Sequence, residues 1–165
     1  MTFKEYQILS EDEQLFIYEA CRATTLPTVD CTQWTWGHVK DTQDSITGSV
    51  DYDTLLKIVQ IETKLTERSD AELVIRSYLA IVESIKSISE AEVVATHYEP
   101  QAKEVLAAQE VGGFDVFGTL PQSLRLVGVL APGLKEVESY PYNTAFATLV
   151  YQSRLNDFQK IVTKQ

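Results

Sequence analysis

The sequence predicts an all-α fold, a single-domain bundle of about seven helices, and two observations predict it. Ser69-Asp70-Ala71-Glu72 has the form of a capping box, in which Ser69 and Glu72 each accept a hydrogen bond from the other's backbone N–H. The apolar residues that follow are spaced four, three, four and three apart, which places them on one face of a helix: Val74, Tyr78, Ile81, Ile85 and Ile88. The same order, a cap and then an apolar face, recurs along most of the 165 residues.

The first two helices are also predicted from capping boxes. Thr2-Phe3-Lys4-Glu5 caps a short helix that ends near Leu9. Ser10-Glu11-Asp12-Glu13 opens a helix that runs to about Ala23, and its acidic first turn suits the positive end of the helix dipole. Residues 15–18 form a wide apolar group, so we expect this helix to be buried on more than one flank.

The middle of the chain predicts a loop and two further helices before the helix at 70–88. Residues 24–33 are rich in β-branched residues and contain a proline, which indicates a loop, with a short extended strand as the alternative. Thr35 is the expected cap of a helix over 36–46. The next helix covers about 52–65, and its apolar residues wrap most of its circumference. We therefore expect it at the centre of the core, packed against the helix at 70–88.

A boundary is predicted near residue 112. Pro100 interrupts the helical pattern, residues 101–110 resume it, and Gly112-Gly113 then gives the strongest break in the chain. The charge balance changes at the same place, because residues 1–110 hold 20 acidic and 9 basic side chains, whereas residues 111–165 hold 4 and 5. These observations suggest an acidic helical part, 1–111, and a C-terminal helical part, 112–165.

The C-terminal part ends in a long predicted helix. A dense apolar segment over 114–130 is followed by the turn Ala131-Pro132-Gly133, and the last helix begins at Pro141 or Asn143. Its apolar residues are expected to form one buried face: Phe146, Leu149, Val150, Leu155, Phe158 and Val162.

The net charge of −10 limits the classes of partner. A nucleic-acid-binding protein needs a basic face for phosphate contacts, and an anionic membrane surface repels a chain this acidic. The charge serves solubility, which is the simpler explanation, or attraction to a basic partner protein. We therefore expect the partners to be other proteins or a second copy of the chain, with no direct nucleic-acid or membrane binding.

The cysteines and the N-terminus predict a cytoplasmic location. Cys21 and Cys31 lack the spacing of a disulfide framework, a redox pair or a zinc site, so both are expected to be reduced and mostly buried. The chain has no apolar signal region at its start and no run of 18 apolar residues.

Catalytic motifs are absent from the sequence, which predicts a protein that is not an enzyme and holds no cofactor. His38 and Asp41 lie three residues apart and share a helix face, so they form a pair suited to general-base or metal chemistry. One histidine and one carboxylate do not complete a site, and a polar surface role is the simpler interpretation. We predict no catalytic, cofactor-binding or metal-binding residues.

The aromatic residues supply the candidate protein interface. Trp34 and Trp36 precede or open a helix, and Tyr140-Pro141-Tyr142 precedes another. Core packing is one explanation of the tryptophans. The functional explanation is an aromatic anchor for a partner, because Trp and Tyr are enriched in interface hot spots. We take Trp34, Trp36, Tyr140 and Tyr142 as the predicted interface residues.

The layout also resembles that of a known class of proteins. Its markers are Trp36-Gly37-His38-Val39-Lys40-Asp41, a helical middle, the segment 118–133 and Ser139-Tyr140-Pro141-Tyr142-Asn143. In size and helical content the chain is similar to small bacteriophage virion and assembly proteins, of the tail-assembly chaperone or head–tail accessory type. The resemblance implies a structural or assembly role through protein–protein contacts.

Two alternatives to an assembly role stay open from the sequence. The first is an acidic inhibitor or decoy that binds a basic host protein. The second is a small enzyme or metal protein that uses His38 and Asp41.

Overall fold

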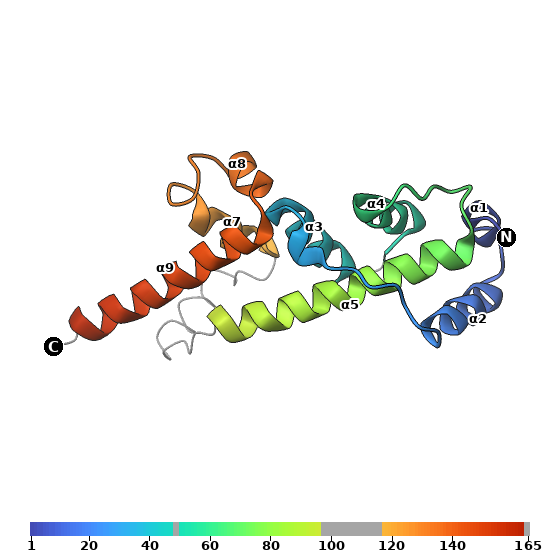
Figure 1. The fold of residues 1–165 in the computed structure, drawn as a ribbon, viewed down its shortest axis with the longest axis horizontal. Helices are drawn as coiled ribbons and strands as arrows, with labels where there is room; N and C mark the ends of the chain where they lie inside the picture. The colour runs from blue at the N-terminus through green and yellow to red at the C-terminus, as the bar shows by residue number, and fades with distance from the viewer. Residues whose placement is uncertain (48–49, 97–116, 164–165) are drawn as a thin grey trace. The chain divides into compact units, whose positions relative to one another are not determined.

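The computed structural model describes residues 1–47, 50–96 and 117–163, and it confirms the all-α fold class. Apart from isolated bridges, the regular structure of these residues is helical (Figure 1). The predicted helix at 101–110 and the predicted boundary at 111–113 lie outside the described residues. The elements are α1 (Phe3–Tyr6), α2 (Glu11–Arg22), the 3-10 helix η1 (Cys31–Gln33), α3 (Trp36–Ile46), α4 (Tyr52–Glu62), α5 (Ala71–Thr96), α7 (Leu120–Leu126), α8 (Leu134–Ser139) and α9 (Tyr142–Thr163).

The chain divides into two compact units, each made of separate stretches of sequence. Unit 1 comprises Met1–Cys31 and Ser45–Ser87, and unit 2 comprises Thr32–Asp44 and Ile88–Gln165. The long helix α5 contributes its first part to unit 1 and its last residues to unit 2. Each unit is described separately below.

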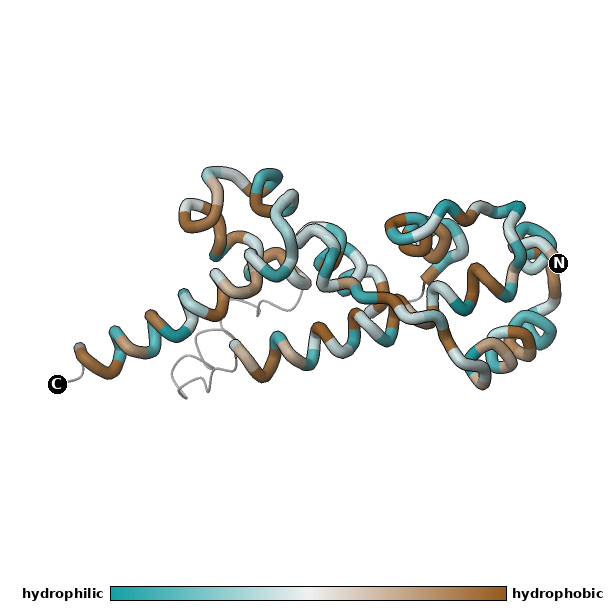
Figure 2. The backbone as a smooth tube through the Cα atoms, viewed as in Figure 1, coloured by the Kyte–Doolittle hydropathy of each residue, from teal (hydrophilic) through white to brown (hydrophobic). Residues whose placement is uncertain are grey.

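Unit 1 is built around the first part of α5. The predicted apolar stripe is buried there, with Val74, Tyr78, Ile81 and Ile85 all 7% exposed or less. Helices α1, α2 and α4 lie along this part of α5 (Figure 1), and the hydropathy of α5 alternates as an amphipathic helix requires (Figure 2). The unit also encloses Cys21 and Cys31 as free, buried thiols, which confirms that prediction.

The helix caps of unit 1 follow the sequence closely, with one correction. The Thr2–Glu5 box forms in full, and the Glu13 carboxylate accepts hydrogen bonds from both the N–H and the hydroxyl of Ser10. Helix α5, however, is capped by Asp70 and not by Ser69. The Asp70 carboxylate accepts from the N–H of Leu73 at 3.2 Å, whereas the Ser69 hydroxyl accepts from the N–H of Thr66 in the preceding turn.

Helix α2 is less buried than its composition suggests. Leu15 and Phe16 are 59% and 76% exposed, so the prediction of burial on more than one flank is wrong. Within α2 it is Cys21 that is fully enclosed. The rest of unit 1 covers a single flank of α2, and the wide apolar group extends beyond that flank.

Unit 2 joins the start of α3 to the start of α9 through the backbone. The N–H of Trp36 donates to the carbonyl of Tyr140 at 2.8 Å, and the N–H of Tyr142 donates to the carbonyl of Trp34 at 2.9 Å. This short bridge fixes two aromatic segments that are more than a hundred residues apart in sequence. Helix α8, between them, was not anticipated from the sequence pattern.

A turn before α7 supplies a test of the local packing in unit 2. Gly118 has a φ of +52°, and a Cβ added there would lie 2.6 Å from Oδ1 of Asp44, whose carboxylate accepts hydrogen bonds from the N–H and hydroxyl of Thr119. Gly128 has a φ of +79° and open space around it. We expect Gly128→Ala to cost about 1–2 kcal/mol through backbone strain alone.

We expect Gly118→Ala to cost that strain plus the displaced Asp44 bonds, each worth about 1 kcal/mol. The measurement is the free energy of unfolding in urea for both variants. Equal losses would show that Asp44 does not constrain this turn.

Among the described helices, none combines the length and the apolar composition that a membrane span requires.

Candidate functional site

The structure places three of the four predicted interface residues in the core of unit 2. Trp34, Trp36 and Tyr142 are 6%, 0% and 2% exposed, while Tyr140 is partly exposed. The Trp36 and Tyr142 rings stack with their centroids 5.7 Å apart, and Phe146 also stacks on Tyr142, at 5.6 Å. This is the core packing that the sequence left as the other explanation. Of the four residues, Tyr140 is the one that the described part of the chain leaves accessible to a partner.

The same aromatic core holds a buried network of charged and polar side chains. Nζ of Lys40 lies 2.6 Å from both carboxylate oxygens of Glu92, and the two side chains are only 4% and 5% exposed. Gln43 bridges the pair by accepting from Lys40 and donating to Glu92, and the Tyr142 hydroxyl donates to Glu92 at 2.8 Å. The Lys40 ammonium also lies 4.3 Å from the centre of the Trp36 ring. Every charged atom in this network thus has a partner.

Burial shapes the proton affinities of this network. Burial lowers the pKa of Lys40, although the nearby Glu92 carboxylate opposes the change. Burial and Glu92 together raise the pKa of Tyr142 well above its usual range. The phenol therefore stays protonated at neutral pH and acts as a donor. The arrangement is saturated with internal hydrogen bonds, which is the chemistry of a structural element.

The sequence contains a signal for this network that was missed. Glu92 lies four residues after Ile88, at the next position of the α5 apolar stripe, so it is a carboxylate on a buried face. Lys40 lies four residues after Trp36 and shares its helix face. A carboxylate at an apolar position predicts a buried cation elsewhere, since a buried charge is otherwise too costly.

The alternative site at His38 and Asp41 lies on the surface. Both side chains are exposed on α3. Among the described residues, no group of three or more His, Cys, Asp or Glu side chains is placed to hold a metal ion.

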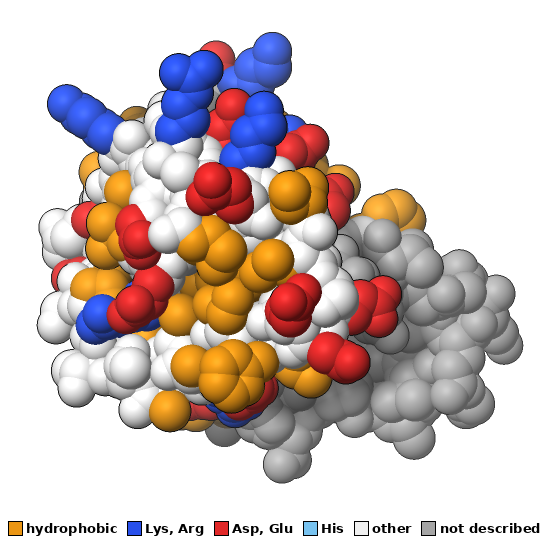
Figure 3. Space-filling view, turned by 90° about the vertical axis from the view of Figure 1, so that its right-hand side faces the viewer, with side chains coloured by type: hydrophobic (Ala, Val, Ile, Leu, Met, Phe, Trp, Pro, Cys, Tyr) orange, Lys and Arg blue, Asp and Glu red, His pale blue; other side chains and the backbone are white. Residues whose placement is uncertain are grey.

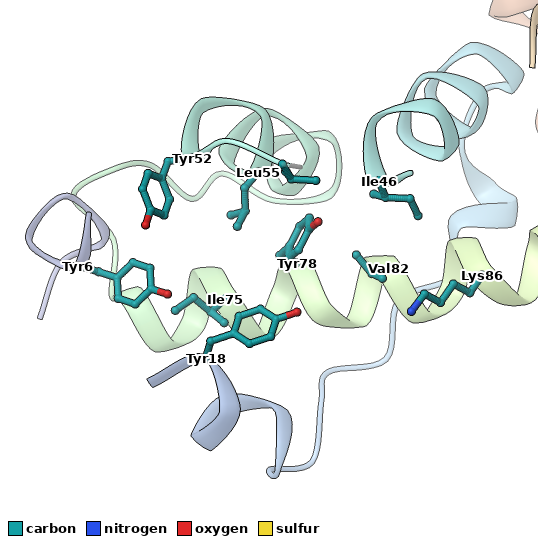
Figure 4. A pocket seen from close by; sticks show the side chains of 10 residues that line it. Tyr6, Tyr18, Ile46, Tyr52, Leu55, Ile75, Tyr78, Val82 and Lys86 are labelled. Carbon is teal, nitrogen blue, oxygen red and sulfur yellow. The ribbon is translucent and has the colours of Figure 1, made fainter. Parts of the chain in front are cut away.

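Unit 1 contains a cleft of about 390 Å³ whose lining includes four tyrosines and Lys86. Tyr6 and Tyr52 meet edge to face, and both donate their hydroxyl hydrogens to Gln14. Figure 4 shows Tyr78 over α5 and the Lys86 side chain running back along α5 towards Val82. Burial raises the pKa of Tyr6 to about 12, and it also raises the pKa of Tyr78.

This cleft has the chemistry of a binding surface. Phenols with raised pKa values stay protonated at neutral pH, so they donate hydrogen bonds and do not act as nucleophiles. Apart from the tyrosines and Lys86, the lining consists of apolar side chains, and within the described residues no histidine or carboxylate lines the cleft. The lining residues are Tyr6, Tyr18, Ile46, Val50, Tyr52, Leu55, Ile75, Tyr78, Val82 and Lys86.

Helix α9 carries two apolar faces, where one was predicted. At 100° per residue, Tyr142, Ala145 and Leu149 point to one side, and these three side chains are buried in unit 2. The residues Tyr151, Leu155, Phe158 and Val162, here called the α9 stripe, point to the opposite side. Tyr151, Phe158 and Val162 are 63%, 63% and 53% exposed, so the prediction of a single buried face is wrong.

A second exposed apolar surface lies in unit 1. Met1, Leu9, Asp12, Glu13, Phe16 and Ile17 line an open groove of about 450 Å³, here called the α2 groove. Figure 3 shows hydrophobic side chains grouped on the end of the unit that carries α1 and α2, with carboxylates around them. Neither this groove nor the α9 stripe was identified from the sequence, because the apolar group at 15–18 and the α9 residues Leu155, Phe158 and Val162 were expected to be buried.

Comparison with known proteins adds no relative. No protein family, no curated protein and no solved structure matches this chain.

Proposed function

We propose that this chain is a non-enzymatic structural or assembly protein that acts through protein–protein contacts. The observation that carries the proposal is the α9 stripe. Four apolar side chains spaced four, three and four apart line one side of a helix, and three of them are more than half exposed. Contiguous exposed apolar surface on a folded chain is typical of an interaction site.

Two further observations support a binding role over a catalytic one. The buried polar network in unit 2 is internally satisfied, so its groups are occupied with each other. The cleft in unit 1 is lined by tyrosines and apolar side chains, with Lys86 as its charged lining residue. A bacteriophage virion component or assembly factor is the more specific form of the proposal, and the resemblance in layout supports it.

The test is site-specific photo-cross-linking in the cells that naturally carry the chain. A photoreactive phenylalanine analogue at Phe158 should form a covalent adduct with another protein chain. The same analogue at Asn156, which is exposed on another side of α9, is the matched control and should form little adduct. Equal adduct at both positions, or none at Phe158, would contradict the proposal.

A further inference from the structure

We propose that the α9 stripe of one copy docks into the α2 groove of a second copy, so that chains associate head to tail. This inference rests on the proposed function and names the partner as the chain itself. It is carried by the match between the two surfaces in apolarity and charge.

The α2 groove is apolar at its centre and acidic at its edge. Phe16, one of its walls, is 76% exposed, and Met1 is 51% exposed. Asp12 and Glu13 line the same groove, and both lie in the first turn of α2. Helix α2 as a whole carries four carboxylates and one arginine. The surface therefore suits an apolar segment that carries positive charge.

Helix α9 has that composition. It carries Arg154 and Lys160 against a single carboxylate, Asp157, within a chain whose net charge is −10. At 100° per residue Lys160 points away from the α9 stripe, so Arg154 is the cation that borders it. Arg154 is exposed and lies one residue before Leu155 and four before Phe158, at the edge of the α9 stripe. A partner that buries Phe158 thus meets a cation beside it.

Pairing unlike surfaces is electrostatically better than pairing like ones. Two α9 stripes facing each other would bring the two copies of Arg154 to one interface, and two α2 grooves would bring the carboxylates Asp12 and Glu13 together. A stripe in a groove instead places the cation at the acidic edge. Such a heterologous contact leaves a free groove and a free stripe at the ends, so chains add until a ring closes or a filament grows.

The size of the contact sets the expected strength. Residues 151–162 span roughly 18 Å of helix at 1.5 Å per residue. A helix segment of this length buries an area at the small end of the range for specific interfaces, which is typical of weak or transient complexes. We therefore expect association that depends on concentration and weakens as salt screens the charges.

Two single variants test the geometry by sedimentation velocity on the purified full chain. Phe16→Ser removes a wall of the groove and keeps the stripe, while Phe158→Ser does the reverse. The wild-type chain should form larger species as its concentration rises, and each variant alone should stay monomeric. An equal mixture of the two should form dimers and nothing larger, because only one intact groove and one intact stripe remain to pair.

Each other outcome overturns the head-to-tail contact. If Phe16→Ser assembles like the wild type and only Phe158→Ser fails, the contact joins two α9 helices. If the mixture stays monomeric, groove and stripe do not bind each other. If the wild-type chain is monomeric at all concentrations, self-association is excluded, and an adduct of Phe158 with a different protein in cells would still support the proposed function.

Discussion

Lys40→Met should destabilise the protein by about 3–5 kcal/mol, the range expected when one partner of a buried ion pair is removed. The substitution keeps the length of the side chain but leaves the Glu92 carboxylate buried without its cation. Lys40 and Glu92 are 4% and 5% exposed, so water cannot replace the lost partner. Equilibrium unfolding in urea measures the loss, and a loss below about 1 kcal/mol would match a solvent-screened pair instead.

The double variant Lys40→Met/Glu92→Gln is the matched control. It removes both charges and keeps an amide oxygen that accepts the hydrogen bond from the Tyr142 hydroxyl. Replacing a complete buried pair by neutral groups is often close to neutral in stability. We therefore expect the double variant to recover most of the loss seen in Lys40→Met. If it is as unstable as the single variant, packing at Lys40 and not charge pairing controls stability.

The single variant Glu92→Gln adds a pH dependence with a definite sign. Burial already lowers the pKa of Lys40 from 10.5, and the Glu92 carboxylate opposes that change. Without the carboxylate the folded-state pKa falls further, so the unfolded chain binds more protons than the folded chain between the two pKa values. Stability in this variant should therefore rise with pH up to about 10.5, relative to Lys40→Met/Glu92→Gln, which lacks the amine. Parallel pH profiles for the two variants would contradict this assignment.

Local structure follows from the sequence where neighbours along the chain determine it. The Thr2 and Ser10 caps and the α5 stripe depend on residues three or four positions apart, and the structure contains all of them. Asp70 replaces Ser69 as the α5 cap because both residues are good acceptors and the preceding turn uses Ser69. Such a choice depends on a neighbouring turn and not on the helix itself.

The α9 stripe and the α2 groove could not be predicted, because the apolar pattern of a helix does not determine whether other helices pack against its apolar side. The periodicity of α9 indicates apolar residues, but it does not indicate that the rest of unit 2 covers Leu149 and leaves Phe158 exposed. Phe16 in α2 is exposed for the same reason. The Lys40–Glu92 pair joins residues 52 positions apart, although Glu92 in an apolar stripe was a usable signal. An apolar stripe thus predicts which side of a helix is apolar, but not whether that side is buried. A charged residue within such a stripe predicts a buried ion pair in the core.

Trp36→Ala should destabilise the protein by about 3–5 kcal/mol, because it leaves a large cavity in a closed core. The Trp36 ring is 0% exposed, stacks on Tyr142, and lies against the Lys40 ammonium. Its Nε1–H donates to the Ser123 hydroxyl at 2.8 Å. Removing the ring therefore removes packing, a cation–π contact and a buried hydrogen bond together. Equilibrium unfolding in urea measures the total loss in the free energy of unfolding.

A double-mutant cycle separates the hydrogen bond from the packing. Trp36→Phe keeps an aromatic ring against Tyr142 but loses the N–H donor, and we expect a loss of about 1–2 kcal/mol. Ser123→Ala leaves the Trp36 donor buried without an acceptor and should cost a similar amount. Because both single variants break the same bond, the double variant should lose less than the sum of the two. Additive losses would show that this bond contributes nothing to stability.

Tyr140→Ala then distinguishes a core aromatic residue from an exposed one. Tyr140 is partly exposed, and its backbone carbonyl, which the substitution keeps, accepts the hydrogen bond from the N–H of Trp36. We expect this variant to lose less than about 1 kcal/mol, well below Trp36→Ala. Unfolding of both variants at low protein concentration excludes any contribution from association. The two losses of unfolding free energy would thus place Trp36 in the core and leave Tyr140 available for a partner.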